Sequence, residues 1–396
     1  MKILVAGAGL GGLTAALALL RAGVDVEVYE QAAQLREVGA GVQLSANGNR
    51  ALFNLGLRET MADWACETAG KEIRLWNTGQ TWKLFDLGAE SVKRYGFPYY
   101  TVYRPDLLAC LADAVSRTKP DALHLGRRCV GLHQDETGVA LRLEGGGAAR
   151  GDALVAADGV RSALRQQLFG DDQPKFTGLV AWRACVPMKD VPSHMRRPIG
   201  TNWVGPGSHV VHYPVHRNEL MNVVAMVERD DWRVESWTMR GTREECKRDF
   251  AGWHGDVLAL LDHAPELYKW ALMLREPRER WTVGRVTLLG DAAHPTLPML
   301  AQGANMAIED GYILGRCVAR WPEDVRTALT RYEDLRRERT RRVVLGSAAS
   351  AQLFHNRALA DPAGAHAYVE REWDEQRVRE RYEWLFTYDV DALALE

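Results

Sequence analysis

The sequence lacks the marks of a membrane protein, a disulfide-bonded protein and a metalloprotein. No apolar run among its 396 residues approaches the roughly 18 residues that a membrane-spanning helix needs. The 6 cysteines form no CxxC pair, and none lies near a histidine at metal-ligand spacing, so we expect reduced thiols and no bound metal. We also expect no signal peptide, because the strand-like run 3–6 follows the first two residues directly. These absences predict a cytoplasmic protein that does not enter a membrane.

An excess of charge of one sign is absent as well. The chain has 50 Lys and Arg against 52 Asp and Glu, which gives a formal net charge of -2. Proteins that bind nucleic acids or anionic membranes usually carry a basic excess, so neither partner is expected. The length predicts two or three domains, and 46% hydrophobic residues suffice for a sizeable core. Glycine, in contrast, is plentiful with 36 residues, and its placement carries the first motif.

The amino-terminal segment has the pattern of a strand, a glycine turn, a helix and a second strand. The apolar run 2–6 precedes the motif GxGxxG, which is followed by a helix and by the second strand at 24–29. In this motif Gly7 permits a tight turn, Gly9 lets a pyrophosphate approach the backbone, and Gly12 lets helix and strand pack closely. This context predicts a bound adenine dinucleotide; the alternative is a glycine turn that serves packing alone.

Two residues beside the glycine turn extend this prediction. Leu10 opens the helix, whose first backbone N–H groups and positive dipole end attract phosphates. Glu30 closes the second strand, where a carboxylate can accept hydrogen bonds from a ribose diol. An acidic residue at this position disfavours a ribose that carries a 2′-phosphate. The fingerprint alone does not separate FAD from NAD, so later motifs must decide between them.

Two later strands each end next to a carboxylate. Strand 153–157 leads into Asp158. Strand 286–289 leads through a glycine into Asp291. The carboxyl ends of parallel strands form the edge where ligands bind in such folds, although a carboxylate there can also serve a structural turn. Further on, prolines stiffen a loop and Gly303 opens a helix that is predicted to run to about Arg320. The free N–H groups at its start can hold an anion.

The chain resembles the FAD-dependent aromatic hydroxylases. The resemblance rests on the order of its motifs, which are the GxGxxG motif, the two carboxylate motifs and the segment 298–310. These hydroxylases are the group A flavoprotein monooxygenases of the para-hydroxybenzoate hydroxylase-like family, and the resemblance covers nearly the whole chain. It implies an α/β fold with a Rossmann-like FAD-binding domain of the GR2 type, an interleaved antiparallel β-sheet substrate domain and C-terminal helices. The last part of the chain is similar to the salicylate, 3-hydroxybenzoate and 6-hydroxynicotinate hydroxylase branch. The implied bounds are 1–71, 101–175 and 271–320 for the FAD-binding domain, 72–100 and 176–270 for the substrate domain, and 321–396 for the C-terminal helical segment.

The resemblance implies FAD as the cofactor and assigns contacts to it. Asp291 would bind the ribityl chain, Asp158 would lie in a groove shared with a nicotinamide, and Arg104 would lie near the flavin phosphate or ribityl region. Arg36 has the family's position in the loop after the second strand. The helix start at Gly303 would face the pyrimidine edge of the flavin. The full implied cofactor-binding set is Gly7, Gly9, Leu10, Gly12, Glu30, Arg36, Arg104, Asp158, Asp291, Pro298, Gly303, Ala304 and Asn305.

The reaction that the resemblance implies is NAD(P)H-consuming monooxygenation. Its substrate would be a small phenolic or hydroxy-aromatic acid, similar to salicylate or hydroxybenzoate, and O2 would supply one oxygen atom through a flavin C4a-hydroperoxide. The resemblance also implies that NADH or NADPH binds transiently. This fits the lack of a second GxGxxG, which disfavours a separate NAD domain. Two alternatives stay open, an oxygen-independent flavin reductase or dehydrogenase and a non-catalytic FAD-binding protein. A homodimer is one assembly that the family allows.

The middle of the chain predicts an antiparallel sheet, with strands at 180–186, 209–215 and 220–227. Strand alternation places His209 and Val211 on one face together with Tyr213, and His212 on the other. One of these faces is expected to cover the flavin. A tyrosine before proline contacts the substrate phenol in the resembled branch, so we expect a catalytic role for Tyr213, with His212 as a second candidate for the base. The alternatives are a core aromatic residue and a histidine satisfied within the fold.

Two further expectations concern the helical parts of the chain. Residues 230–275 are expected to be largely helical, and so is the charged segment 321–396. The arginine-rich stretch Arg331–Arg342 within that segment is expected to form a solvated helix face.

Overall fold

A computed structural model describes residues 1–35, 40–171, 174–232, 234 and 239–396. Its six-stranded sheet starts from the amino-terminal β-α-β unit, and its buried, apolar strands are typical of a parallel sheet that is covered on both faces. All neighbours in it pair in parallel except β18, which lies antiparallel at one edge. In spatial order the strands are β18 (Thr282–Val283), β19 (Val286–Leu288), β12 (Ala153–Ala156), β1 (Lys2–Ala6), β2 (Asp25–Tyr29) and β8 (Leu123–His124).

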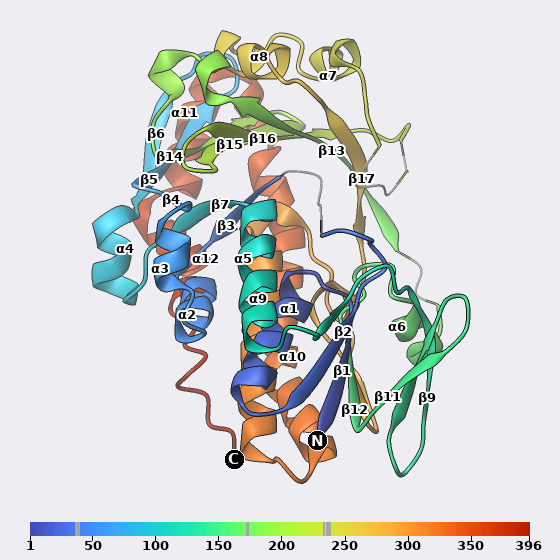
Figure 1. Ribbon diagram of the computed structural model, residues 1–396. Helices are drawn as coiled ribbons and strands as arrows, with labels where there is room; N and C mark the ends of the chain where they lie inside the picture. Colours follow the sequence, from blue (N-terminus) through green and yellow to red (C-terminus); the bar gives the residue numbers. More distant parts are fainter. Residues whose placement is uncertain (36–39, 172–173, 233, 235–238) are drawn as a thin grey trace.

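Three helices pack beside this sheet, and glycines set how closely two of them approach. A side chain at Gly311 of α9 would place its Cβ 2.5 Å from the backbone nitrogen of Ala15 in α1. At Gly315 the Cβ would lie 2.6 Å from the Cβ of Ala18. These contacts hold α9 against α1 along its length (Figure 1). The helices are α1 (Leu10–Arg21), α5 (Arg104–Thr118) and α9 (Gly303–Arg320).

A seven-stranded sheet forms the other large layer. The helices α7 (Arg243–Asp249) and α8 (Gly255–Asp262) cover its outer face, as Figure 1 shows at the top of the molecule. Neighbouring strands are antiparallel apart from the parallel pair β14 and β5. In spatial order the strands are β17 (Tyr268–Leu274), β13 (Lys175–Pro187), β16 (Leu220–Glu228), β15 (Ser208–Val215), β14 (Ile199–Gly205), β5 (Gly70–Leu75) and β6 (Thr81–Asp86).

The three antiparallel strands expected in the middle of the chain are confirmed as parts of β13, β15 and β16. The expectation that 230–275 is largely helical is wrong, because among its described residues only Arg243–Asp249 and Gly255–Asp262 are helical and β17 at the end of the segment pairs with β13. Tyr268–Leu274 is a short apolar run, and such runs fit a buried strand as well as a buried helix, so only pairing with β13 decides the outcome.

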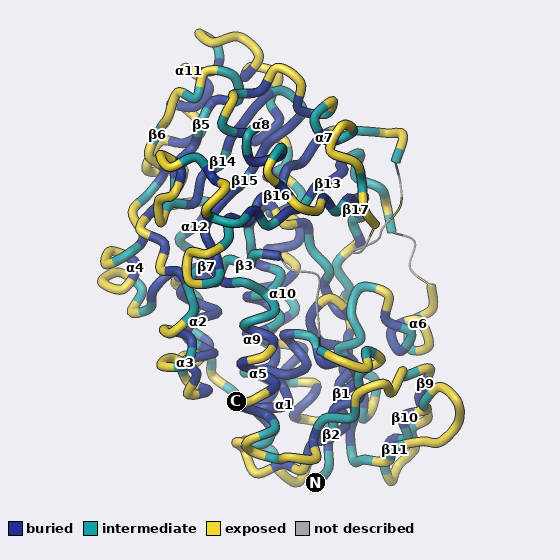
Figure 2. The backbone as a smooth tube through the Cα atoms, turned by 45° about the horizontal axis from the view of Figure 1, so that its top comes forward, coloured by how far each residue is buried: buried dark blue, intermediate teal, exposed yellow. Residues whose placement is uncertain are grey.

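Two small sheets complete the strand content. One consists of β9, β10 and β11 and stands out at the side of the molecule with much of its surface exposed (Figure 2). The other places β3 beside β7 and β7 beside β4, next to the cavity described below. Their bounds are β9 (Cys129–Gln134), β10 (Val139–Leu143), β11 (Ala148–Gly151), β3 (Gly41–Leu44), β7 (Tyr100–Tyr103) and β4 (Cys66–Glu67).

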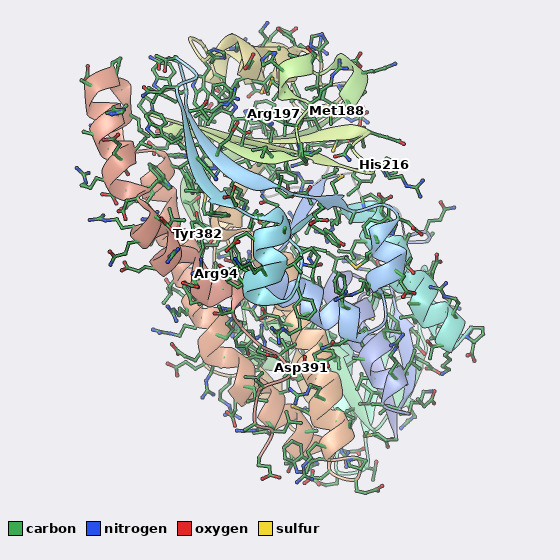
Figure 3. The ribbon with its side chains drawn as sticks, turned by 90° about the vertical axis from the view of Figure 1, so that its left-hand side faces the viewer. Arg94, Met188, Arg197, His216, Tyr382 and Asp391 are labelled. Carbon is green, nitrogen blue, oxygen red and sulfur yellow. The ribbon has the colours of Figure 1, made fainter. Side chains whose placement is uncertain are left out.

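The predicted α/β class is confirmed, because a Rossmann-like sheet is interleaved along the chain with an antiparallel one and C-terminal helices follow. The domain bounds given above stay predictions. The remaining helices are α2 (Ala46–Asn54), α3 (Arg58–Ala62), α4 (Gly88–Tyr95), α6 (Ala163–Phe169), α10 (Val325–Phe354), α11 (Pro362–Glu372) and α12 (Glu375–Phe386). Figure 3 shows α10 and the C-terminal helices along one side of the molecule, with Tyr382 of α12 near α4. No helix in the described part of the chain combines the length and the apolar character that crossing a membrane requires.

The arginine-rich stretch of α10 corrects one expectation, because part of it is buried rather than solvated. Arg336 is fully buried and forms ion pairs with Glu309 at 2.6 Å and with Asp310 at 2.7 Å. Arg339 approaches Glu309 at 3.2 Å. The two carboxylates come from α9, so the buried charges of the two helices neutralise one another and fasten α10 to α9.

Candidate active site

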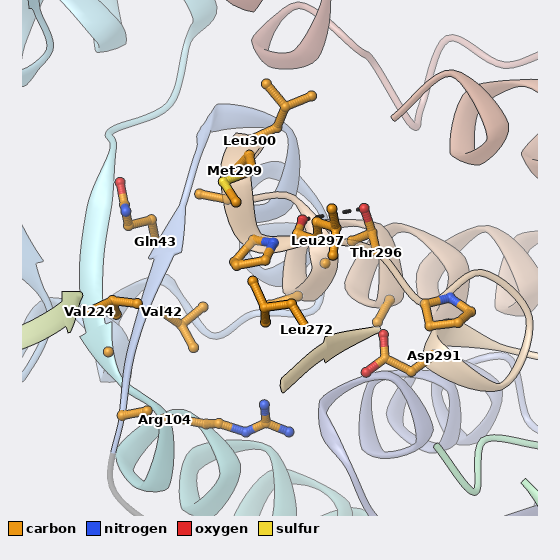
Figure 4. A pocket seen from close by; sticks show the side chains of 18 of the residues that line it. Val42, Gln43, Arg104, Val224, Leu272, Asp291, Thr296, Leu297, Met299 and Leu300 are labelled. Atoms are coloured by element: carbon orange, nitrogen blue, oxygen red, sulfur yellow. Dashed lines mark hydrogen bonds between the residues drawn. The ribbon is translucent and has the colours of Figure 1, made fainter. Parts of the chain in front are cut away.

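A cavity of about 350 Å³ lies between the two large sheets. Its walls come from the glycine turn after β1, from β3, from the loop 295–301, from the start of α9 and from one face of the seven-stranded sheet. Figure 4 shows Arg104 and Asp291 at one end of this space and Met299 and Leu300 at another. The cavity therefore joins the predicted dinucleotide site to the predicted substrate sheet.

The glycine turn has the geometry of a phosphate cradle. Gly7 has a φ of +101°, and a Cβ there would lie 2.3 Å from the carbonyl oxygen of Ala157. A Cβ at Gly12 would lie 2.0 Å from the carbonyl oxygen of Gly7. Gly9, in contrast, faces open space within the cavity wall, beside Leu10 at the start of α1. Packing thus requires glycine at Gly7 and Gly12, whereas Gly9 leaves its backbone open to a ligand.

Glu30 lies at the end of β2, where its carboxylate is held by backbone groups. Oε2 accepts the N–H of Ala8 at 2.8 Å, and Oε1 accepts the N–H of Ala32 at 2.8 Å. Each oxygen has further acceptor capacity, so the carboxylate can also receive hydroxyl groups of a ribose. Arg36, the other residue expected in this region, lies outside the described residues.

Asp291 and Arg104 line the same end of the cavity. Arg104 opens α5, and its backbone N–H donates to the carbonyl of Ala40 at 2.9 Å. The carboxylate of Asp291 is accessible from inside the cavity but surrounded by protein, so burial raises its pKa while the charge of Arg104 opposes the rise. A carboxylate and a guanidinium at the same end of the cavity fit a ligand that has both hydroxyl groups and phosphates.

Asp158 does not line the cavity. Its carboxylate accepts the hydroxyl of Ser162 at 2.5 Å and the N–H of Leu164 at 3.3 Å, at the start of α6. Burial raises the pKa of Asp158, and the hydrogen bond from Ser162 opposes the rise. The cavity is lined instead by Gly159 and Val160, so the structure gives Asp158 the position of a residue that shapes the turn.

The start of α9 faces the cavity through backbone rather than through Asn305. Pro298, Gly303 and Ala304 line the cavity. The amide of Asn305 is fully buried, and each of its hydrogen bonds goes to backbone. Oδ1 accepts the N–H of Ser45 at 3.1 Å, and Nδ2 donates to the carbonyls of Gln43 and Ala301, both at 2.9 Å. Asn305 therefore fastens β3 to α9, while the free N–H groups of the first helical turn are available to an electron-rich ligand.

The expected face of β15 lies toward the cavity. His209, Val211 and Tyr213 all line it, as strand alternation predicted. Burial raises the pKa of the Tyr213 hydroxyl, so this phenol is neutral at physiological pH. His212 is on the opposite face, where burial and the charges of Arg74 and Arg197 lower its pKa to about 3. The structure does not bring His212 to the cavity, so the catalytic role considered for it does not fit its position.

His209 is a functional candidate that sequence reasoning did not single out. Its Nδ1 lies 2.6 Å from Nε2 of His355, and Nδ1 of His355 lies 3.3 Å from a carboxylate oxygen of Glu228. The two histidines are buried, whereas the Glu228 side chain is 60% exposed. These groups form a continuous polar path from the cavity to the surface. Alternation did place His209 on the face of Tyr213, but no local pattern relates it to His355 at the end of α10.

The cavity fits a flavoprotein site, because it has a glycine cradle and two open helix starts beside an aromatic compartment. Glu30, a ribose acceptor, lies outside the cavity lining and is bound to the backbone of Ala8 beside the glycine cradle. Residues 1–347 match the family model described as FAD binding domain. The chain therefore belongs to this FAD-binding family, in its aromatic hydroxylase branch, and FAD is its cofactor, as the motifs predicted.

Three similar proteins indicate where in the family the chain stands. It is 39% identical over 354 residues to 3-amino-4-hydroxybenzoate 2-monooxygenase PtnB3 of Streptomyces platensis. The matched region covers 89% of this chain and 88% of that protein. It is 36% identical over 395 residues to 3-hydroxybenzoate 6-hydroxylase of Polaromonas naphthalenivorans (strain CJ2), covering 98% and 96%. Among solved structures, Klebsiella pneumoniae HpxO complexed with FAD and uric acid is similar with a TM-score of 0.84 and 28% identity, covering 98% and 97%.

Proposed function

We propose that this chain hydroxylates a small hydroxy-aromatic acid, with NADH or NADPH as electron donor and O2 as oxygen source, in the cytoplasm. The observation that carries the proposal is one cavity that joins an FAD cradle to a face of the seven-stranded sheet with Tyr213 and His209 on it. The substrates named for two relatives, 3-amino-4-hydroxybenzoate and 3-hydroxybenzoate, support an aromatic acid. When bound and reduced, FAD supplies the activation of oxygen.

We assign the contacts to FAD from the geometry of the cradle. The backbone at Gly9 and Leu10 holds the pyrophosphate, and Glu30 holds the adenine-side ribose. Asp291 and Arg104 hold the ribityl chain and its phosphate. The backbone of Pro298, Gly303 and Ala304 borders the flavin ring. Asp291→Ala is expected to lower the FAD content of the purified protein while the fold, measured by circular dichroism, is retained.

The aromatic end of the cavity contains the groups that can handle a proton. Tyr213 donates or accepts a hydrogen bond at the ring hydroxyl and so orients the substrate. His209 Nε2 takes the hydroxyl proton while its Nδ1 proton passes to His355, and the Nδ1 proton of His355 passes to Glu228, which releases it to solvent. The apolar side chains Val211 and Leu272 keep water away from the ring.

A panel of aromatic acids tests the proposed function. FAD-loaded enzyme is mixed with NADH or NADPH and with 3-hydroxybenzoate, salicylate, 6-hydroxynicotinate or 3-amino-4-hydroxybenzoate, and products are identified by mass spectrometry. At least one acid is expected to accelerate consumption of the donor and to yield a hydroxylated product. Anaerobic turnover with an artificial electron acceptor and no oxygenated product would instead favour an oxygen-independent oxidoreductase.

A further inference from the structure

A lysine without an anionic partner lies in the wall of the aromatic compartment. Lys71, on β5, lines the cavity, and its Nζ donates to the hydroxyl of Tyr99 at 2.8 Å. The same ammonium group lies 4.7 Å from the centre of the Tyr99 ring and 5.9 Å from that of Phe85. No carboxylate of the described residues forms an ion pair with Lys71, and burial alone lowers the pKa of its ammonium group to about 7. This cation therefore has aromatic neighbours and a neutral hydroxyl, but no counter-charge.

On the opposite face of β5 the charged side chains do have counter-charges, so the lack of one at Lys71 is not a general property of the sheet. Glu72, the next residue, accepts from Arg74 at 2.9 Å and from Arg197 at 2.6 Å. Charges on the outer face are thus paired within the protein. On the cavity face, a ligand anion would supply the counter-charge and so favour the charged form of the ammonium group.

The stem of Lys71 is directed along the sheet by a glycine on the neighbouring strand. Lys71 pairs with Gly200 of β14, and a Cβ at Gly200 would lie 3.4 Å from Cγ and 3.7 Å from Cε of the lysine. Strands β14 and β15 are antiparallel, with Thr201 opposite His212, so Tyr213 of β15 lies next to Gly200 of β14. The lysine stem thus occupies the space that Gly200 leaves open, between β5 and the strand that contains Tyr213.

A hydrogen-bond chain links the ammonium group to the opposite wall of the cavity. The Tyr99 hydroxyl, which accepts from Lys71, donates to Oε1 of Gln43 at 2.8 Å. The Gln43 side chain also acts on the Tyr213 hydroxyl, because it opposes the rise in pKa that burial gives this phenol. Lys71 is therefore linked through Tyr99 to Gln43, in a cavity whose lining also includes the polar side chains Arg183, Asn202 and His209.

We propose that Lys71 binds the carboxylate of the aromatic substrate and thereby selects acids over neutral phenols. The inference rests on the proposed function and adds the residue that recognises the acid group. An aromatic acid fits because aromatic side chains line the same cavity and can pack against a flat ring; they are Tyr213, Trp270, Phe354 and Tyr382. Contact with an anion restores the positive charge that burial disfavours, so binding is coupled to uptake of a proton.

Calorimetric titration of the FAD-loaded protein tests this assignment without turnover. The probes are 3-hydroxybenzoate, salicylate and 6-hydroxynicotinate, each compared with its neutral amide, at about pH 8 in buffers of different ionisation enthalpy. In the unmodified protein at least one acid is expected to bind better than its amide and to take up close to one proton. In Lys71→Met, affinity for that acid is expected to fall about 10- to 100-fold and the proton uptake to disappear, with the amide little affected.

Two further variants separate charge from structure. Lys71→Arg keeps a cation that stays charged near pH 8, so it is expected to retain most of the affinity for the acid without proton uptake. Lys83→Met is the matched control, because Lys83 lies on the adjacent strand β6 with its side chain 69% exposed. It is expected to behave like the unmodified protein. FAD content and melting temperature are measured for each variant.

The proposal is overturned if Lys71→Met weakens acid and amide equally, if its proton uptake persists, or if no acid is bound with proton uptake by the unmodified protein. Failure of the proposed function has a different signature. In that case acids bind with proton uptake that depends on Lys71, but none yields a hydroxylated product with NADH or NADPH.

Discussion

Tyr213 has its place in the cavity because side chains alternate along a strand. One position earlier, His212 lies under the outer helices, where no hydrogen-bond partner within the described residues reaches either ring nitrogen. Four positions earlier, His209 lies on the cavity face and contacts His355. His209 and His212 are three positions apart, and this odd spacing puts them on opposite faces of the strand, so only His209 can exchange a proton with a ligand in the cavity.

Tyr213→Phe removes the cavity hydroxyl and keeps the ring. We expect FAD content and melting temperature to be unchanged, and the yield of hydroxylated product per NADH consumed to fall several-fold, because the substrate hydroxyl loses a partner that orients it. The measurement is product formed against NADH oxidised. An unchanged ratio would remove Tyr213 from the chemistry and leave it as a core aromatic residue.

His355→Ala interrupts the path from His209 to Glu228. Burial lowers the pKa of His209 and of His355, so both rings are neutral at physiological pH and can pass a proton on rather than retain it. We expect proton release after binding of a phenolic acid, followed with an indicator dye, to slow about tenfold or more and to recover with added imidazole.

The control for this variant is His263→Ala, because His263 is exposed at the end of α8 and bonds only to the carbonyl of Ala259. It is expected to release the proton at the normal rate. Normal proton release in His355→Ala would show that the proton leaves the cavity by another route.

At the scale of elements, the sequence predicted the bounds of α9 but not the contact that attaches this helix to β3. Its predicted course, from Gly303 to about Arg320, is confirmed, because prolines stiffen the loop before it and its composition favours a helix. Its attachment to β3 could not be predicted. The bond from Ser45 to Asn305 joins residues 260 positions apart, and no local pattern encodes such a contact.

Asn305→Ala tests this attachment. Without the amide, one N–H and two carbonyls lose their partner at the join of β3 and α9, and each unpaired group costs about 1–3 kcal/mol when it stays buried. We expect affinity for FAD to fall about tenfold or more, because the flavin-facing loop loses its support. Fluorescence titration with FAD measures the effect, and Asn54→Ala, at an exposed site on α2, provides the comparison. Equal affinities of the two variants would contradict the role given to Asn305.

At the scale of the whole molecule, the fold holds its long C-terminal helix by buried charge. Glu309 and Asp310 of α9 meet Arg336 and Arg339 of α10, and Asp310 also lies 2.6 Å from Nε2 of His294. The sequence showed the arginines and predicted a solvated face for them. Helical periodicity predicts which residues share one side of a helix, but it does not predict the charges on the helix that packs against that side. The pairing of these charges is therefore seen only in the folded structure.

Arg336→Met leaves these carboxylates without their main counter-charge. The free energy of unfolding is expected to fall by about 3–5 kcal/mol, as when one partner of a buried ion pair is removed. Arg341→Met, at an exposed position of the same helix, is expected to change it little. Chemical denaturation of both variants decides the matter, and equal losses would contradict a stabilising role for the buried cluster.

The same cluster is expected to make the stability of the protein depend on pH in the acid range. Despite their burial, Glu309 and Asp310 have lowered pKa values, chiefly because of the charges of Arg339 for Glu309 and His294 for Asp310. The stability that they contribute is present above the ordinary carboxyl range and is lost as the pH falls through their lowered pKa values. Unfolding measured between neutral pH and about pH 3 is expected to show this loss, and Arg336→Met to reduce it.

The measurement that bears most directly on the central claim is the origin of the oxygen atom in the product. FAD-loaded enzyme is supplied with the pyridine nucleotide and the aromatic acid that react fastest together, under isotope-labelled O2, and the product is analysed by mass spectrometry. The account predicts one labelled oxygen on the aromatic ring and no product when FAD or the electron donor is omitted. Full conversion of the acid without labelled oxygen, or with an artificial acceptor in the absence of O2, would contradict it.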